Sequence, residues 1–150
     1  MVKYVKGDLF DSDADIFAHG CNCRGGFGSG IAGSMSRIYP KTRHEYLEKF
    51  EDEGWKLGDV QFVRVFSPGS RDRVVANCAT QDEYYPRDKC HANYPAIKTC
   101  MEKVRDFAKP RSLTVAIPKI GAGLAGGDWG IIEGILNEVF LDCDVTVYYL

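Results

Sequence analysis

The position of the glycines constrains the fold of this chain more than any other sequence feature. They concentrate in two stretches, Gly20–Gly33 (GCNCRGGFGSGIAG) and Gly121–Gly130 (GAGLAGGDWG). Each stretch follows a predicted strand and precedes a predicted helix. In open α/β sheets, ligands bind at loops of this kind, outside the carboxyl ends of strands. The glycines therefore indicate an α/β fold with a ligand site built from two loops.

The spacing of apolar residues predicts the elements on either side of these loops. Strands are predicted at residues 2–6, 15–19, 58–66, 73–80, 113–117 and 145–149, with a turn at 67–70. Helices are predicted over about 30–38, from Pro40 to near Gly54, over 92–107, and along the apolar face Ile132, Ile135, Leu136, Val139 and Phe140. This order predicts a single α/β domain, residues 1–150, with helices on both faces of a central mixed sheet of about six strands.

Composition limits the classes of partner. The chain has 19 Lys and Arg against 21 Asp and Glu, whereas binding to duplex nucleic acid or anionic membranes needs clustered positive charge. The first residues hold no apolar run long enough for a signal peptide or a membrane span. Six cysteines without a C-x-x-C pair indicate reduced thiols rather than a disulfide scaffold or a zinc site. We therefore expect a cytoplasmic monomer that needs no metal or cofactor and contacts neither membrane nor duplex nucleic acid.

Glycine in the two loops has two interpretations. It permits positive φ and close approach of backbone N–H groups to an anion, and the following helix N-terminus adds partial positive charge. The alternative is turn chemistry and tight packing of helix on sheet. Both loops also contain G-x-G-x-x-G, at Gly28/Gly30/Gly33 and at Gly121/Gly123/Gly126. A dinucleotide fold is not expected, because a second helix follows the first motif and the second motif lies too near the C-terminus. With little Lys or Arg in either loop, the pattern favours a phosphate cradle of backbone amides.

Two aspartates stand beside predicted loops. Asp8 ends the first strand, where an ionised carboxylate can accept a hydrogen bond from the exocyclic amine of adenine or can cap a turn or helix. Asp128 precedes the last helix, where an N-cap is the simplest interpretation and a general base or water-positioning group is the alternative.

Three further polar residues flank the first loop. His19 ends the second strand, either as an ordinary strand-end histidine or as a catalytic group. Asn22 starts the loop and can donate to a ribose hydroxyl or form an Asx-turn. Gln81 follows the fourth strand and is expected to point into the same cleft.

Taken together, the motifs resemble the macrodomain family over essentially the whole chain. They are Lys6-Gly7-Asp8-Leu9, Cys21-Asn22-Cys23 with Gly28-x-Gly30-Ile31-Ala32, Pro118-Lys119-Ile120-Gly121-Ala122-Gly123-Leu124 before Asp128-Trp129, and the terminal Thr146-Val147-Tyr148-x-Leu150. Within the family the chain looks most similar to the branch that contains the fungal-type ADP-ribose 1″-phosphate phosphatase and the terminal ADP-ribose protein glycohydrolase. The resemblance implies a macrodomain-like three-layer α/β/α sandwich and an ADP-ribose ligand.

The resemblance also implies how ADP-ribose is held. Asp8 would hold the adenine amine, and the loop Gly28–Ala32 would line the diphosphate and the distal ribose. Asn22 would approach the distal ribose, and Gly121–Leu124 would close over the diphosphate from the other side. The residues expected to contact the ligand are Gly7, Asp8, Leu9, Cys21, Asn22, Gly28, Ser29, Gly30, Ile31, Ala32, Gln81, Pro118, Ile120, Gly121, Ala122, Gly123 and Leu124.

The activity implied by the resemblance is that of the phosphatase. The glycohydrolase of this branch uses a lysine that forms a covalent ribose adduct and an aspartate in the second glycine loop. The corresponding positions here are Gln81 and Ala125, and glutamine cannot form a Schiff base. The phosphatase shares Cys21-Asn22-Cys23, the glycine loop and an equivalent of His19.

The resemblance thus implies hydrolysis of ADP-ribose 1″-phosphate to ADP-ribose and phosphate by direct attack of water, without a metal. His19 would protonate the leaving ribose oxygen or orient water, Asp128 would polarise the attacking water, and Asn22 would lie at the distal ribose. Two alternatives stay open. One is a non-catalytic reader that binds ADP-ribose, free or on ADP-ribosylated macromolecules. The other is a hydrolase of ADP-ribosyl groups or O-acetyl-ADP-ribose that acts without the covalent lysine.

Overall fold

The predicted strands form one sheet in a computed structural model, which describes residues 1–66, 71–86 and 89–150. The strands are β1 (Val2–Lys6), β2 (Ile16–Cys21), β3 (Val60–Val65), β4 (Arg73–Ala79), β5 (Val115–Ile117) and β6 (Val145–Tyr149). All six predicted strands are confirmed, with small shifts at their ends. The turn predicted at 67–70 lies outside the described residues.

The helices also form where the apolar periodicity predicts them. They are α1 (Gly30–Ile38), α2 (Pro40–Asp52), α3 (Tyr94–Ala108) and α4 (Trp129–Val139), with two short 3-10 turns, η1 (Leu9–Asp11) and η2 (Lys109–Arg111). Pro40 begins α2, where its missing N–H leaves no hydrogen bond unmade. The two 3-10 turns were not predicted, because three residues are too few to show an apolar period.

The strand order decides which loops become neighbours. The sheet runs β1-β6-β5-β2-β4-β3. Every adjacent pair is parallel except β3 and β4, so the predicted mixed sheet is confirmed. The carboxyl ends of the five parallel strands therefore meet at one edge. The two glycine stretches follow β2 and β5, which are neighbours in the middle of the sheet.

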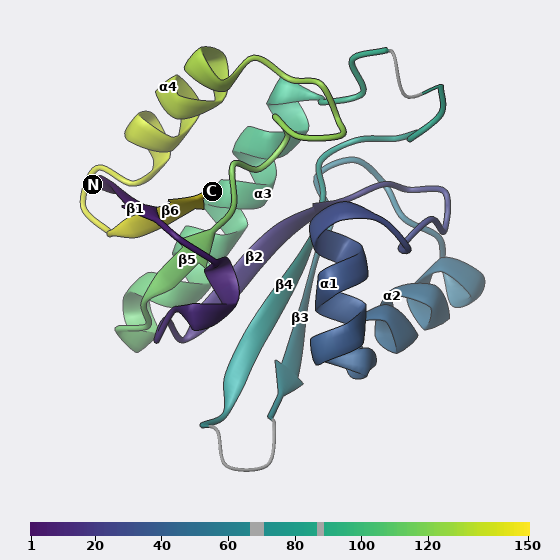
Figure 1. Ribbon diagram of the computed structural model, residues 1–150, viewed down its shortest axis with the longest axis horizontal. Helices are drawn as coiled ribbons and strands as arrows, with labels where there is room; N and C mark the ends of the chain where they lie inside the picture. The colour runs from purple at the N-terminus through teal and green to yellow at the C-terminus, as the bar shows by residue number, and fades with distance from the viewer. Residues whose placement is uncertain (67–70, 87–88) are drawn as a thin grey trace.

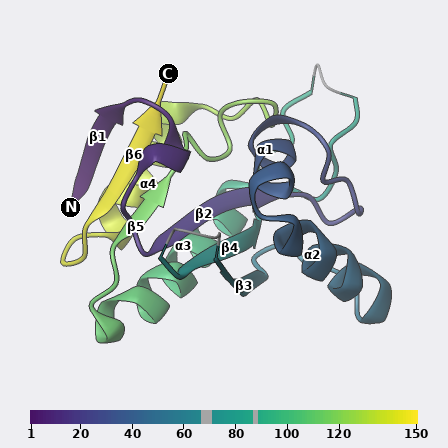
Figure 2. The ribbon, with the colours of Figure 1, turned by 60° about the horizontal axis from the view of Figure 1, so that its bottom comes forward.

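Helices cover both faces of the sheet, as Figures 1 and 2 show. On one face of the sheet, buried side chains of α3 and α4 form a single hydrophobic cluster with the strands. On the opposite face, residues of α1 and α2 belong to two smaller clusters. The central strand β2 is buried on both sides, and Ile16, Phe17 and Ala18 have no exposed surface. The chain thus has the three-layer α/β/α architecture expected for it.

A buried arginine fastens the segment between η1 and β2. Arg73 donates to the backbone carbonyls of Ala14 (2.8 Å) and Ser12 (2.9 Å) and to the hydroxyl of Tyr39 (3.0 Å). Its guanidinium also lies 4.1 Å from the ring centroid of Phe17. Because buried carbonyls without a donor cost free energy, this one side chain fixes the path of the chain after β1.

Three observations concern the described part of the chain, residues 1–66, 71–86 and 89–150. No helix there is long and apolar enough to cross a membrane. No group of three or more His, Cys, Asp and Glu side chains there is placed to hold a metal ion. The six cysteines are free thiols, of which Cys90 is exposed.

Candidate functional site

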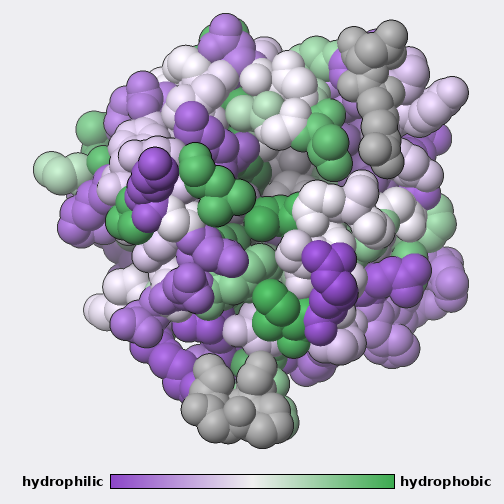
Figure 3. Space-filling model, viewed as in Figure 1, coloured by the Kyte–Doolittle hydropathy of each residue, from purple (hydrophilic) through white to green (hydrophobic). Residues whose placement is uncertain are grey.

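The two glycine loops meet at the carboxyl edge of the sheet. The first leads from β2 into α1, and the second leads from β5 into α4. Leu124 of the second loop lies over Gly30 of the first, since a Cβ added at Gly30 would be 3.1 Å from Leu124 Cδ1. Gly30 has a φ of +60°, which favours glycine at this close approach. Figure 3 shows the molecular surface hollowed where the loops meet.

Packing explains some of the loop glycines. At Gly121, where φ is +77°, an added Cβ would lie 2.8 Å from Ile97 and 3.1 Å from Ile132. At Gly127 it would lie 2.5 Å from the carbonyl oxygen of Gly121, to which the N–H of Gly127 donates at 2.8 Å. Tight turn geometry accounts for both positions, as one of the two interpretations expected.

Packing does not explain Gly28 and Gly123. An added Cβ would meet nothing within 4 Å at either position, and neither residue has a positive φ. Both are exposed, one on each loop. Open space beside glycine backbone on two loops that touch is what a ligand approaching that backbone requires. The geometry therefore supports the phosphate-cradle interpretation at these two positions.

The start of α1 offers free backbone N–H groups to this hollow. Ser29 is the N-cap of α1, but its side chain makes no capping hydrogen bond, and the first turn holds no acidic residue. The N–H groups of the first turn of a helix have no partner within the helix and carry partial positive charge. In contrast, Asn93 and Asp128 cap α3 and α4 with side-chain oxygens. The start of α1 is thus suited to an anion such as phosphate.

Asp8 lies at the far end of the same edge, after β1. Its Oδ1 accepts a hydrogen bond from the backbone N–H of Phe10 at 2.9 Å and so caps η1. The carboxylate is exposed, and Oδ2 has no hydrogen-bond partner among the described residues. The capping interpretation is therefore correct, and it leaves one oxygen for a ligand. The neighbouring N–H of Gly7 donates to the carbonyl of Tyr149 at 2.7 Å, which joins this corner to β6.

Asn22 uses its side chain to shape the first loop. Its Oδ1 accepts from the backbone N–H groups of Arg24 (2.9 Å) and Gly26 (3.1 Å) and from the hydroxyl of Tyr46 (3.0 Å). Its Nδ2 donates to the carbonyl of Gly26 at 2.6 Å. These bonds form the Asx-turn that was one of its two expected roles. The structure therefore favours loop organisation over direct contact with a ribose.

His19 has no exposed surface. Its Nε2 lies 2.6 Å from Oδ1 of Asn77, and its ring is edge-on to Phe27 with centroids 5.5 Å apart. The amide of Asn77 is oriented by its Nδ2, which donates to the carbonyl of Thr42 (3.1 Å) and to Oε1 of Gln61 (3.0 Å). Nε2 of His19 must therefore carry the proton donated to Asn77, and Nδ1 must carry the lone pair.

This arrangement revises the expected role of His19. Burial lowers the pKa of the imidazole to about 4, so the ring is neutral at physiological pH. Nδ1 has no hydrogen-bond partner in the part of the chain that the structure describes. A neutral ring whose only proton is engaged by Asn77 is not a proton donor for a leaving ribose oxygen. His19 instead supports the base of the first loop from beneath Phe27.

Asp128 and Gln81 lie on the segments that follow β5 and β4. Asp128 is exposed and caps α4, accepting from the N–H of Ile131 at 3.3 Å, as its simplest interpretation predicted. Gln81 pairs with Ala92 in an isolated bridge, and its Nε2 donates to the carbonyl of Glu83 at 2.7 Å. Its side chain is thus engaged along its own segment.

The other predicted contact residues divide by exposure. Gly7, Ile31, Ala32, Pro118 and Ala122 keep part of their surface exposed. Leu9, Cys21 and Ile120 are buried, and burial raises the pKa of the Cys21 thiol well above its ordinary value. The side chains of these three residues therefore belong to the hydrophobic core.

Sequence reasoning missed Tyr84 as a neighbour of the first loop. A Cβ added at Gly26 would lie 2.7 Å from Cε1 of Tyr84, so the ring rests on the loop backbone. The only local signal was a pair of tyrosines, Tyr84 and Tyr85, in a polar segment. Nothing in the sequence of that segment predicts a contact with Gly26.

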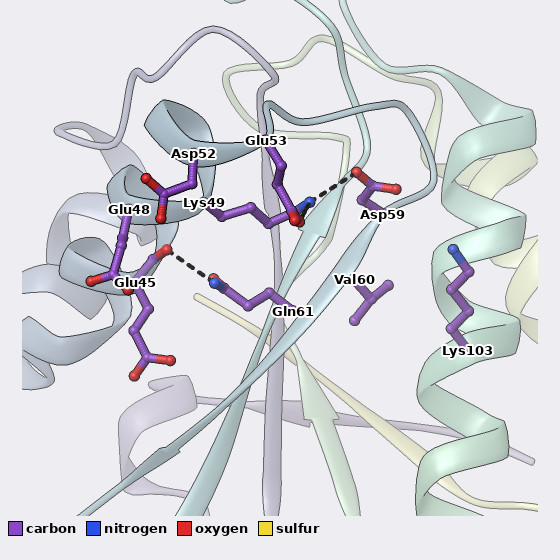
Figure 4. A pocket seen from close by; sticks show the side chains of 9 residues that line it. All are labelled: Glu45, Glu48, Lys49, Asp52, Glu53, Asp59, Val60, Gln61 and Lys103. Carbon is purple, nitrogen blue, oxygen red and sulfur yellow. Dashed lines mark hydrogen bonds and ion pairs between the residues drawn. The ribbon is translucent and has the colours of Figure 1, made fainter.

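Two cavities lie away from this hollow. One of about 400 Å³ lies between α2, β3 and α3, and Figure 4 shows the acidic side chains and the two lysines that line it. There, Lys49 pairs with Glu53 at 2.7 Å and with Asp59 at 3.3 Å. A second of about 580 Å³ lies beside the α1–α2 junction. Neither includes a residue of the glycine loops.

Comparison with known proteins identifies the family of this chain. The Macro domain family matches residues 18–136. The chain is 32% identical over 177 residues to an ADP-ribose 1″-phosphate phosphatase of Debaryomyces hansenii, covering 99% of this chain and 98% of that protein. It is 35% identical over 152 residues to a 17.5 kDa protein of Enterobacteria phage T4, covering 98% and 95%. A macrodomain protein from Streptomyces coelicolor superposes with a TM-score of 0.83 at 32% identity, covering 100% and 99%.

The family match spans both glycine loops, the start of α1 and most of α4. The uncapped start of α1 and the residues at which the two loops meet all lie within this segment. The chain belongs to the macrodomain family.

Proposed function

We propose that this chain binds ADP-ribose and hydrolyses ADP-ribose 1″-phosphate to ADP-ribose and inorganic phosphate. The observation that carries the proposal is the pair of open glycines, Gly28 and Gly123, on two loops that meet beside the free N–H groups of α1. A diphosphate fits such a backbone cradle without a basic side chain. The relative from Debaryomyces hansenii bears the name of this activity, and the alignment covers nearly the full length of both chains.

The order of the strands supports an extended ligand along the carboxyl edge. Asp8 follows β1 at one end, the second loop follows β5, the first loop follows β2, and Gln81 follows β4. In the proposed complex the free oxygen of Asp8 accepts a hydrogen bond from the adenine amine. The diphosphate then lies between the loops, and the distal ribose lies toward β4.

The proposed chemistry is direct hydrolysis. Water attacks phosphorus, the bond between phosphorus and the 1″ oxygen breaks, and that oxygen takes a proton from solvent. The diphosphate held by the backbone N–H groups at the start of α1 positions the distal ribose and its phosphate for this attack. Asp128, the exposed carboxylate that ends the second loop, accepts the proton of the attacking water. His19 and Asn22 act by holding the first loop in shape, because Nε2 of His19 and the side-chain amide of Asn22 are hydrogen-bonded inside the protein.

One observation favours a second candidate, a reader that binds ADP-ribose without turnover. Of the three predicted catalytic residues, His19 and Asn22 are buried and hydrogen-bonded, and Asp128 is an N-cap. Hydrolysis by the covalent lysine route is not proposed, because Gln81 occupies that position and cannot form a Schiff base.

A single purified protein distinguishes the two functions. We expect phosphate release from ADP-ribose 1″-phosphate at micromolar protein, and calorimetric binding of ADP-ribose. Binding without phosphate release identifies a reader, and no binding of either compound contradicts the whole proposal.

Asp8→Ala tests the adenine contact. A hydrogen bond to a charged group contributes about 1.5–3 kcal/mol, so the Kd for ADP-ribose should rise by roughly tenfold or more. Asp8→Asn keeps an oxygen to cap Phe10 but removes the charge, which separates binding from stability. Asp13→Ala, an exposed aspartate of the same segment, is the matched control and should bind normally. Equal affinity of wild type and Asp8→Ala contradicts the proposed pose.

A further inference from the structure

The segment that joins β4 to α3 contacts both glycine loops. At its start, the carbonyl of Asp82 accepts from the N–H of Cys23 at 3.0 Å, and its carboxylate pairs with Arg24 at 2.9 Å. At its end, the N–H of His91 donates to the carbonyl of Ala125 in the second loop at 2.7 Å. In Figure 1, residues 80–86 lead away from the carboxyl end of β4, and residues 89–93 lead into the start of α3. It therefore borders the end of the hollow nearest β4.

Tyr84 is the side chain that this segment places on the first loop. An added Cβ at Gly26 would lie 2.7 Å from Cε1 and 3.0 Å from Cζ of the tyrosine ring, and 3.1 Å from Nδ2 of Asn22. Gly26 does not have a positive φ, so its backbone conformation does not require glycine. The approach of the Tyr84 ring supplies the reason for a glycine at this position.

The Tyr84 ring contacts the loop backbone and remains partly exposed to solvent. Tyr84 is 49% exposed, which is high for a tyrosine packed against backbone. The residue before it is fixed by the hydrogen bond from Gln81 to the carbonyl of Glu83 and by the pairing of Arg24 with Glu83 at 3.4 Å. A tyrosine loses little conformational entropy when it is positioned, so it makes an effective wall.

The position of this wall follows from the order of the strands. Asp8 stands after β1, and Tyr84 stands beyond β2 on the side of β4, at the opposite end of the carboxyl edge. In the proposed complex the adenine lies at Asp8 and the distal ribose lies toward Tyr84. The group attached to C1″ of that ribose therefore leaves the hollow at the tyrosine ring.

We propose that Tyr84, resting on Gly26, closes the distal end of the groove and restricts the ligand to small ADP-ribose derivatives. A phosphate at C1″ is small enough to lie beside the ring, whereas a polypeptide attached at C1″ requires the ring to move. The substrate class is thus the free nucleotide rather than ADP-ribosylated protein. This inference rests on the proposed function, because that function sets the orientation of the ligand.

The test compares two ligands by calorimetry: ADP-ribose and a peptide that carries one ADP-ribose on a serine. Wild type should bind the peptide at least about tenfold more weakly than ADP-ribose, a difference of about 1.4 kcal/mol. Tyr84→Ala should bring the two Kd values to within about twofold, because specificity that depends on a clash disappears with the clashing group. Tyr85→Ala, the more exposed neighbour at 76%, is the matched control and should keep the wild-type ratio.

A second variant displaces the ring without removing it. In Gly26→Ala the new methyl group overlaps the ring of Tyr84, so the ratio of the two Kd values should change. The same substitution in a Tyr84→Ala background should leave the ratio unaltered, because no ring remains to be displaced.

The inference is overturned if wild type binds both ligands equally, or if Tyr84→Ala weakens both by the same factor and leaves their ratio unchanged. A protein that binds ADP-ribose but releases no phosphate contradicts the proposed hydrolysis alone, and the ratio still tests the wall. Wild type that does not bind ADP-ribose contradicts the proposed function and this inference together.

Discussion

Lowering the pH from 7.5 to 5 should destabilise this protein through His19. The imidazole has no exposed surface, and burial lowers its pKa from 6.5 to about 4 in the folded chain. In the unfolded chain the same group takes up its proton near pH 6.5. Between those two values the unfolded state binds more protons than the folded state, so stability falls as pH falls. Above pH 6.5 the contribution is fully present, and below about pH 4 it is fully lost.

The two pKa values set the magnitude. Their separation corresponds to a total of about 3 kcal/mol, since one pKa unit equals about 1.4 kcal/mol. At pH 5 the unfolded state is almost fully protonated and the folded state is almost fully neutral. The loss between pH 7.5 and pH 5 is therefore about 2 kcal/mol.

Urea unfolding followed by circular dichroism at a series of pH values measures this loss. His19→Gln keeps a donor for Asn77 but does not titrate, so its free energy of unfolding should fall by about 2 kcal/mol less than that of wild type over this range. The comparison uses slopes, so a constant offset in stability between the variants does not matter. His44→Gln removes an exposed histidine of α2 and should retain the wild-type slope. Parallel pH profiles for wild type and His19→Gln refute the reasoning.

Two further substitutions test the site and the fold. Gly30→Ala should weaken ADP-ribose binding about tenfold, because alanine disfavours the φ of +60° and its methyl group would lie 3.1 Å from Leu124. Calorimetry measures the Kd of this variant beside that of Gly134→Ala, a control at a helical glycine with open space around it. Equal affinities of the two variants contradict the loop geometry. Arg73→Leu should lower the free energy of unfolding by about 3 kcal/mol, because it leaves two buried carbonyls without donors; a urea midpoint close to that of wild type argues against this role for Arg73.

The secondary structure could be predicted because its signals are local. Apolar spacing and glycine position identify the six strands and four helices, and Pro40 fixes the start of α2. The order of the strands could not be predicted, since β1 pairs with β6 and β5 inserts between β6 and β2. Pairing between distant segments depends on the packing of the whole sheet, and no short pattern in the sequence records it.

The site was predictable to the level of its loops and not to the level of its side chains. Asn22 was identified as a loop residue with two expected roles, and its bonds with Gly26 and with Tyr46 of α2 show that its amide is engaged inside the protein. His19 was identified at a strand end, but its neutral state depends on burial beneath the first loop and its tautomer on Asn77 of the neighbouring strand. Tyr84 could not be identified at all, because its contact with Gly26 joins segments far apart in the chain.

Residue order was enough to predict two glycine loops, each after a strand and before a helix, in a chain without the positive charge of a nucleic-acid-binding protein. The backbone freedom of glycine and the start of a helix are local properties, so a phosphate cradle of amides can be foreseen from residue order. Only the folded structure shows that a side chain would clash with its neighbours at Gly121 and Gly127, whereas open space lies beside Gly28 and Gly123. The physical reason is that the space beside a glycine is filled or left open by side chains from distant parts of the chain, as Ile97 and Ile132 fill it at Gly121.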